Sequence, residues 1–125
     1  MKRRWLKDWP WTTVMTINAA LCQEKNALHK PTSDGYKPAE KFWEASRDRE
    51  LTLREILELC RHCHKLAPFC FYNGNTFAAI GRTIIQEILR KMSPAKAHTF
   101  RSVVGHFIAG TIGSAELEKS LRDLD

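Results

Sequence analysis

The stretch TLREILELCRHCHKLAP, residues 52–68, indicates the fold class most directly. Its first four residues match a capping box, in which the Thr52 hydroxyl and the Glu55 carboxylate each accept a hydrogen bond from an otherwise unpaired backbone amide. Apolar side chains and cysteines then recur at spacings of three and four residues, which places them on one face of a helix. Pro68 marks the end of this helix. The stretch therefore predicts an amphipathic helix with a well-defined start.

Three more helices are expected on the C-terminal side, because apolar side chains recur there at helical spacing. Their expected ranges are 76–92, 94–111 and 114 onwards. Residues suited to the N-cap precede or open each of them: Asn75, Ser93 and Ser114. Pro94 fits the first turn of its helix, since a proline there loses no intrahelical hydrogen bond.

Two helices are expected on the N-terminal side. The first covers residues 10–28, with Pro10 in its first turn and apolar side chains on one face. The segment HKPTSDGYKP, residues 29–38, is rich in turn-forming residues and predicts a loop too short to divide two domains. A short helix then begins at Pro38, with Phe42, Trp43 and Ala45 expected to face inward.

No segment shows sustained alternation of apolar and polar residues, so no sheet is expected. The sequence predicts an all-α fold: one domain over residues 1–125, built as an irregular or orthogonal bundle of five to six helices. Residues 1–9 would form a basic, aromatic N-terminal arm.

The composition fits a globular protein, with 43% hydrophobic and 27% charged residues. No stretch approaches the length of a transmembrane helix, so no membrane association is expected. The first 22 residues begin with basic side chains, but Thr12, Thr13, Thr16 and Asn18 interrupt the apolar run that a signal peptide needs. We therefore expect a cytoplasmic protein whose four cysteines are reduced thiols.

The charge is strongly positive and unevenly placed. The net charge is +6, and residues 1–7 carry four cations with no acid, whereas residues 113–125 carry four acids and two cations. This balance predicts a polyanionic partner, either nucleic acid or an acidic protein surface. Trp5, Trp9 and Trp11 lie among the N-terminal cations, where they could stack on bases or form a hydrophobic lid.

The helices expected over 76–92 and 94–111 are joined by a tight turn, as in a helix-turn-helix, although any helical bundle contains such pairs. The outward face of the second would present residues able to meet bases or phosphates: Lys96, Thr99, Arg101, Ser102 and His106. The Asn73-Gly74 turn could offer backbone amides to an anion, with Arg82 nearby, or simply precede a capped helix. The predicted anion-binding or nucleic-acid-binding residues are Lys2, Arg3, Arg4, Arg82, Arg90, Lys91, Lys96 and Arg101.

Cysteine and histidine gather near the end of the helix expected over 52–68. Cys60, Cys63, His64 and Cys70 could supply the three thiolates and one imidazole of a structural zinc site. The alternative is that Cys60 and Cys63 are small buried hydrophobic residues, which is common for cysteine. The CxxCH pattern also matches covalent haem attachment, but that chemistry normally follows export. No bound cofactor is therefore expected, with structural zinc as the alternative.

No HExxH motif or ordered Ser, His and Asp set is present. The sequence predicts a non-enzymatic interaction module with a basic surface, which binds nucleic acid or serves as an accessory subunit of a nucleoprotein or protein assembly. A metal-stabilised helical protein that uses the cysteine cluster is the alternative, and a small enzyme is the third possibility.

Overall fold

The computed structural model describes residues 2–123 and confirms an all-α fold. The helices in this range are α1 (Trp11–Glu24), α2 (Tyr36–Ser46), α3 (Leu53–Leu66), α4 (Asn73–Ile84), α5 (Gln86–Arg90), α6 (Pro94–Ala109) and α7 (Ser114–Arg122). Extended backbone pairs in the described range only at two isolated bridges, Arg3 with Leu51 and Pro31 with Phe69. Within the same range, no helix combines the length and apolar character needed to cross a bilayer.

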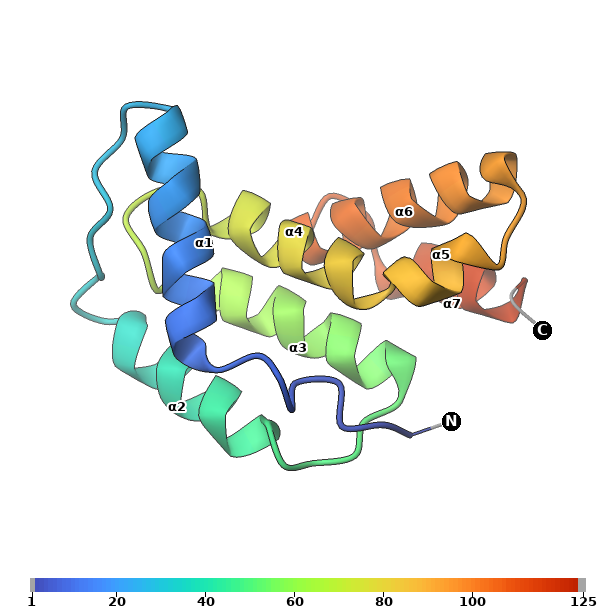
Figure 1. The fold of residues 1–125 in the computed structure, drawn as a ribbon, viewed down its shortest axis with the longest axis horizontal. Helices are drawn as coiled ribbons and strands as arrows, with labels where there is room; N and C mark the ends of the chain where they lie inside the picture. Colours follow the sequence, from blue (N-terminus) through green and yellow to red (C-terminus); the bar gives the residue numbers. More distant parts are fainter. Residues whose placement is uncertain (1, 124–125) are drawn as a thin grey trace.

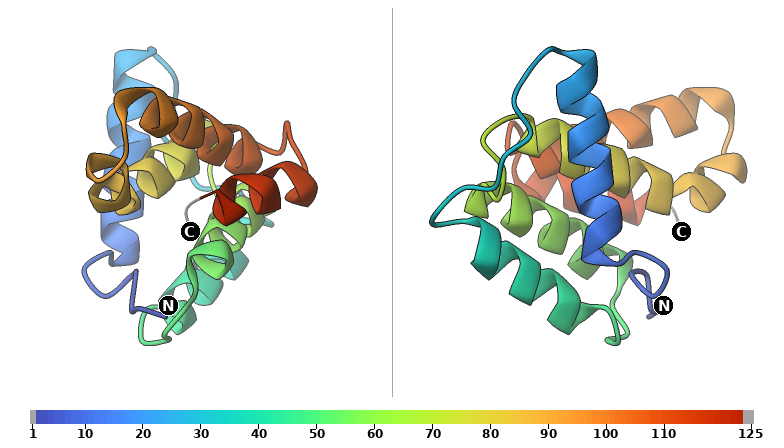
Figure 2. Two further views of the ribbon diagram at one scale, coloured as in Figure 1. Left: turned by 90° about the vertical axis from the view of Figure 1, so that its right-hand side faces the viewer. Right: turned by 60° about the vertical axis from the view of Figure 1, so that its left-hand side comes forward.

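The centre of the bundle is formed by α3, α4 and α6, which pack on one another. Figure 1 shows α1 crossing this group steeply, with α2 beside α3 on the same end. The two further views in Figure 2 show α7 lying against the opposite end, where it packs on α6. The steep crossings agree with the irregular bundle expected from the short connections between helices.

Two helix starts follow the local sequence signals. The Thr52 amide donates to Glu55 Oε1 at 2.8 Å, and the Glu55 amide donates to Thr52 Oγ1 at 3.1 Å, so the capping box is confirmed. The hydrogen bond from the Thr52 backbone amide lowers the pKa of the Glu55 carboxyl. Ser93 caps α6 through a bond from the Lys96 amide, with Pro94 in the first turn.

Trp11 lies at the centre of an aromatic cluster that joins α1 to three other segments. Its ring stacks on Phe69 at a centroid distance of 5.9 Å and an interplanar angle of 9°. Trp43 and Tyr36 of α2 approach it edge-on at 6.2 and 5.8 Å, and Phe77 of α4 lies at 6.4 Å. Burial of rings of this size, with their preferred edge and offset contacts, is a large part of what stabilises a small core.

The helix expected over 76–92 begins earlier and is divided at Ile85, which raises the number of helices in the described chain to seven. Asn75 does not cap it. The Asn73 side chain instead accepts from the Phe69 amide at 2.9 Å and donates to the Phe69 carbonyl at 2.7 Å, which closes the connection into a tight turn. Tyr72 then takes a left-handed conformation, with φ of 62°, and α4 starts at Asn73.

The ends of three other helices also differ from the expected ones. α1 stops at Glu24, because Asn26 adopts a positive φ and the Ala27 amide bonds back to the Cys22 carbonyl at 2.8 Å. α2 begins at Tyr36, two residues before Pro38. Ser114 is the first residue of α7 and Gly113 its N-cap, with the Gly113 amide bonded to Glu116.

The expected inward face of α2 is only partly correct. Trp43 is fully buried, together with Ala39 and Ser46, which follow the i, i+4, i+7 spacing of one helix face. Phe42 and Ala45 lie outside that stripe and are exposed. The Phe42 ring rests on His62 of α3 at a centroid distance of 4.7 Å, so it shields a surface rather than filling the core.

The loop before α2 runs along the C-terminal end of α3. The Thr32 amide donates to the Pro68 carbonyl at 2.9 Å, and the Thr32 hydroxyl donates to the Ala67 carbonyl at 2.6 Å. These bonds bring Gly35 so close that a Cβ atom added there would lie 1.8 Å from the Leu66 carbonyl oxygen. The backbone at the end of α3 occupies the space that a side chain at position 35 would need.

We predict that Gly35→Ala lowers the free energy of unfolding by about 1–3 kcal/mol, because the loop or the end of α3 must move to admit the methyl group. Gly113→Ala is the matched control, since Gly113 also stands at an N-cap but its Cβ would come no closer than 3.4 Å to another atom. Urea denaturation of both variants measures the difference. Equal losses in the two variants would show that the close approach at Gly35 is not a constraint.

Candidate functional site

The N-terminal arm is fixed beside the start of α3. The Arg3 amide donates to the Leu51 carbonyl at 3.0 Å, and the Leu51 amide donates to the Arg3 carbonyl at 2.8 Å. Trp5 Nε1 also donates to the Leu51 carbonyl, and the Leu6 side chain is fully buried. Lys2, Arg3 and Arg4 are exposed on this arm, at a distance along the chain from the other predicted cations.

The three N-terminal tryptophans fit a hydrophobic lid. Trp11 is 2% exposed and belongs to the central aromatic cluster. Trp5 and Trp9 are half-buried and pack against the core, and the Trp9 carbonyl accepts a hydrogen bond from Trp43 Nε1 at 2.8 Å. Because these rings are engaged with the protein, they do not form a free row on which bases could stack.

Arg82 is the most constrained of the predicted cations, because its side chain lies where α4 and α6 cross closely. A Cβ atom added at Gly81 of α4 would lie 2.4 Å from Ile108 Cδ1. One added at Gly105 of α6 would lie 2.2 Å from Nη2 of Arg82 and 2.8 Å from its Cζ. Gly81 therefore makes room for the Ile108 side chain, and Gly105 makes room for the guanidinium group of Arg82, which lies across the α6 backbone there.

Arg82 has no anionic partner within residues 2–123. None of the ion pairs in this range includes it, and its Nε atom is buried without a hydrogen-bond partner. The guanidinium group is always charged and presents several donors in a rigid plane. The guanidinium group over Gly105 is therefore a half-buried cation, and no carboxylate of residues 2–123 forms an ion pair with it.

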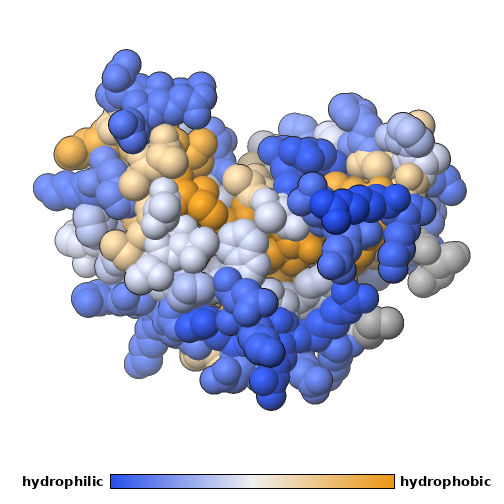
Figure 3. Space-filling model, viewed as in Figure 1, coloured by the Kyte–Doolittle hydropathy of each residue, from blue (hydrophilic) through white to orange (hydrophobic). Residues whose placement is uncertain are grey.

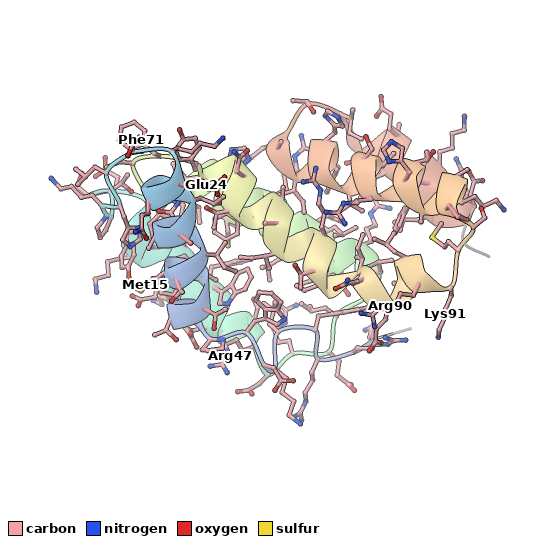
Figure 4. The ribbon with its side chains drawn as sticks, turned by 45° about the horizontal axis from the view of Figure 1, so that its top comes forward. Met15, Glu24, Arg47, Phe71, Arg90 and Lys91 are labelled. Carbon is pink, nitrogen blue, oxygen red and sulfur yellow. The ribbon has the colours of Figure 1, made fainter. Side chains whose placement is uncertain are left out.

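The other cations of this region are exposed. Figure 4 shows Arg90 and Lys91 together at the end of α5, pointing away from the helices. Lys96 and Arg101 are exposed on α6, but they are five residues apart and therefore about 140° apart around the helix. Arg101 stands one turn before Gly105, whereas Lys96 lines a pocket of about 550 Å³ beside α7.

The outward face expected for α6 is thus divided between two flanks. Thr99 and His106 are exposed, and Ser102 is half-buried. In Figure 3, hydrophilic side chains lie beside a hydrophobic, hollowed strip over α4, α5 and α6. Residues 79–112 carry five cations and one acid, Glu87, so this part of the molecule has an excess of positive charge as large as that of residues 1–7, which carry four cations and no acid.

The four residues predicted as zinc ligands are not brought together. Cys60 and Cys63 are fully buried in the core, and burial raises the pKa of both thiols, that of Cys63 to about 12. His64 Nδ1 lies 2.9 Å from the Ile108 carbonyl. Cys70 is exposed in the turn before α4. Over residues 2–123, no three His, Cys, Asp or Glu side chains are grouped so that they could hold a metal ion.

A buried polar network around Asn18 was not expected from the sequence. Asn18 Nδ2 donates to the Phe71 carbonyl at 2.8 Å and to Thr76 Oγ1 at 3.0 Å. Its Oδ1 atom is therefore the acceptor for His29 Nδ1, at 2.8 Å, and for the Cys22 thiol, at 3.5 Å. The network ties α1 to the start of α4, and the only sequence signal for it is an amide on an otherwise apolar helix face.

We predict that Asn18→Ala lowers the free energy of unfolding by about 1–3 kcal/mol, because buried polar partners in α4 and the preceding turn lose their hydrogen bonds. Thr16→Ala is the control on the same helix, since the Thr16 hydroxyl is exposed and bonds only to the Thr12 carbonyl. It should change the stability by no more than about 0.5 kcal/mol. A neutral Asn18→Ala variant in thermal or urea unfolding would show that the network is not stabilising.

We also predict that the cysteines differ in reactivity. Alkylation requires the thiolate, so burial and raised pKa values should protect Cys60 and Cys63 from iodoacetamide at neutral pH, while exposed Cys70 reacts first. Mass spectrometry of the briefly treated native protein measures this order, and all cysteines should react in guanidinium chloride. Modification of Cys63 as fast as Cys70 in the native protein would contradict its burial, and stoichiometric zinc in the purified protein would restore the metal hypothesis.

No protein-family model matches the chain, and neither does any curated protein or solved structure. The charges, contacts and burial of the chain's own residues are therefore the basis for a proposed function.

Proposed function

We propose that this protein is a non-enzymatic module that binds nucleic acid through the cations of α4, α5 and α6. The proposal is carried by one observation. Residues 79–112 hold five cations against a single carboxylate, and none of the five takes part in an ion pair within residues 2–123. The cations concerned are Arg82, Arg90, Lys91, Lys96 and Arg101.

Unpaired cations on one group of helices suit a phosphate backbone. Each phosphate that a lysine or arginine neutralises releases condensed counterions, which favours binding without reading a base sequence. Arg82 adds orientation to this general attraction, because its guanidinium group is held across Gly105 and loses little freedom on binding. Arg101, one helical turn away on α6, lies on the same flank.

Lys2, Arg3 and Arg4 are left out of the proposed interface. The pairing of Arg3 with Leu51 places them at the start of α3, where the Lys2 charge contributes to the lowered pKa of Glu55. They add to the overall positive field, which speeds the encounter with a polyanion. We assign direct phosphate contacts to the five cations of α4, α5 and α6 only.

We predict that affinity for a generic duplex or single strand falls steeply with salt, with a slope set by the number of phosphates neutralised. Arg101→Glu should weaken binding about tenfold and flatten that slope by about one, without changing the circular dichroism spectrum. Lys96→Glu tests the opposite flank of α6. Because the two side chains lie about 140° apart, a larger effect of Arg101→Glu would place the phosphates on the Arg82 flank.

Lys41→Glu is the matched control. Lys41 is exposed on α2, which packs mainly on α3 and α1 and carries none of the five cations of the proposed interface. It changes the net charge as much as Arg101→Glu does, so it measures the effect of the overall field alone. Absence of binding to DNA and RNA at low salt would overturn the proposal and leave an acidic protein surface as the partner to seek. Equal effects of Lys41→Glu and Arg101→Glu would show that no local interface exists.

A further inference from the structure

A second cationic site lies away from the α4–α5 flank, in a pocket of about 330 Å³ between α3, α6 and the start of α7. Arg61, His62 and Lys65 of α3 form one wall, and Phe107 of α6 forms the floor. Ser114 of α7 closes the opposite side. The pocket is within the size range of small-molecule sites in proteins.

Arg61 is held in this pocket by contacts with Phe107 and with the Ile112 carbonyl. Its Cζ atom lies 4.7 Å from the centroid of the Phe107 ring, a distance that gives a cation–π interaction. Its Nη1 atom makes a long hydrogen bond, 3.4 Å, to the Ile112 carbonyl, and its Nε atom is buried without a partner. No ion pair in residues 2–123 includes Arg61, so its charge is fixed in place and not neutralised.

Lys65 adds positive charge to the same wall, beside the ring of His62. Lys65 follows Arg61 by one helical turn, so both side chains leave the same face of α3. The His62 ring is held at the pocket edge by Phe42, at a centroid distance of 4.7 Å. Glu58 is the one carboxylate of the lining, and it pairs with Arg54 at 2.9 Å.

The start of α7 contributes little of its own. The Gly113 amide already donates to Glu116 Oε2 at 3.0 Å, so this end of the helix is capped by its own chain. The cationic side chains of α3, and not the helix terminus, therefore provide the attraction for an anion.

We propose that this pocket binds the phosphate group of a small phosphomonoester, with Arg61 and Lys65 as its principal ligands. The planar fork of an arginine matches two oxygens of a phosphate, and a lysine one turn away adds a second charge. A dianionic monoester meets both charges, whereas a phosphodiester offers a single one. This site is separate from the nucleic-acid interface proposed on α4, α5 and α6.

The first test is a titration of the ¹⁵N-labelled protein with inorganic phosphate, at an ionic strength kept constant with sodium chloride. Saturable shifts of the backbone amides of Arg61, His62, Lys65 and Ser114 are expected. Methyl phosphate should bind the same residues, and dimethyl phosphate should bind about tenfold more weakly, because it carries one charge fewer. Shifts that do not saturate, or that chloride reproduces, would overturn the proposal.

Variants then assign the ligands. Arg61→Lys keeps the charge but loses the fork, and Lys65→Gln removes a charge from an exposed side chain; each should weaken phosphate binding about tenfold. Lys25→Gln is the control, since Lys25 is exposed beyond the end of α1, far from α7 (Figure 1). If Arg61→Lys disturbs the packing on Phe107, Lys65→Gln still decides the question. Unchanged affinity in Lys65→Gln would overturn the assignment, and phosphate binding retained in Arg101→Glu would separate this pocket from the α4–α6 interface.

Discussion

The close approach of α4 and α6 at Gly81 and Gly105 is the contact on which the arrangement of this protein depends. A side chain at either glycine would overlap its neighbour, Ile108 in one case and Arg82 in the other. With the two backbones near each other, α3 packs against both and completes the centre of the bundle. The same contact fixes a charged side chain, because Arg82 can lie across α6 only where α6 has no Cβ atom. The crossing of α4 and α6 therefore determines both how these helices pack and where the Arg82 charge lies.

The aromatic cluster around Trp11 has a matching role at the other end of the molecule. It joins α1 and α2 to Phe69 and to Phe77 of α4, while the Asn18 network fixes the turn between α3 and α4. Both are needed because the turn contains exposed Phe71 and left-handed Tyr72, which local sequence preferences alone do not hold in place. In a small all-helical protein with short connections, steeply crossing helices are held mainly by side-chain contacts. Here those contacts are the buried rings around Trp11 and the buried amide of Asn18.

How far the sequence predicts this structure depends on whether a signal is local. The Thr52 capping box and the Ser93 N-cap involve neighbouring residues only, and both were correctly predicted. Asn75 was wrong as a cap because Asn73, two residues earlier, bonds both backbone groups of Phe69 and moves the helix start. Spacing along a helix also could not show that Cys70 lies apart from Cys60 and Cys63, since the direction of the chain after Pro68 is set by tertiary contacts. The charge excess of residues 79–112 was visible in the sequence, but which cations share a flank was not.

The two proposed sites share one feature: in each, an arginine from a neighbouring helix packs against α6. Arg82 of α4 rests on Gly105, where the absence of a side chain makes room, and Arg61 of α3 rests on Phe107, where a flat ring receives it. Gly105 and Phe107 are two residues apart, so they point about 200° apart around the helix. The two guanidinium groups therefore lie on opposite flanks of α6, and a single phosphate cannot reach both. A helix that presents separate fixed cations on its two sides is suited to two different anions, which is why a nucleic acid is assigned to the flank of Arg82 and Arg101, and a small phosphomonoester to the pocket beside Arg61 and Lys65.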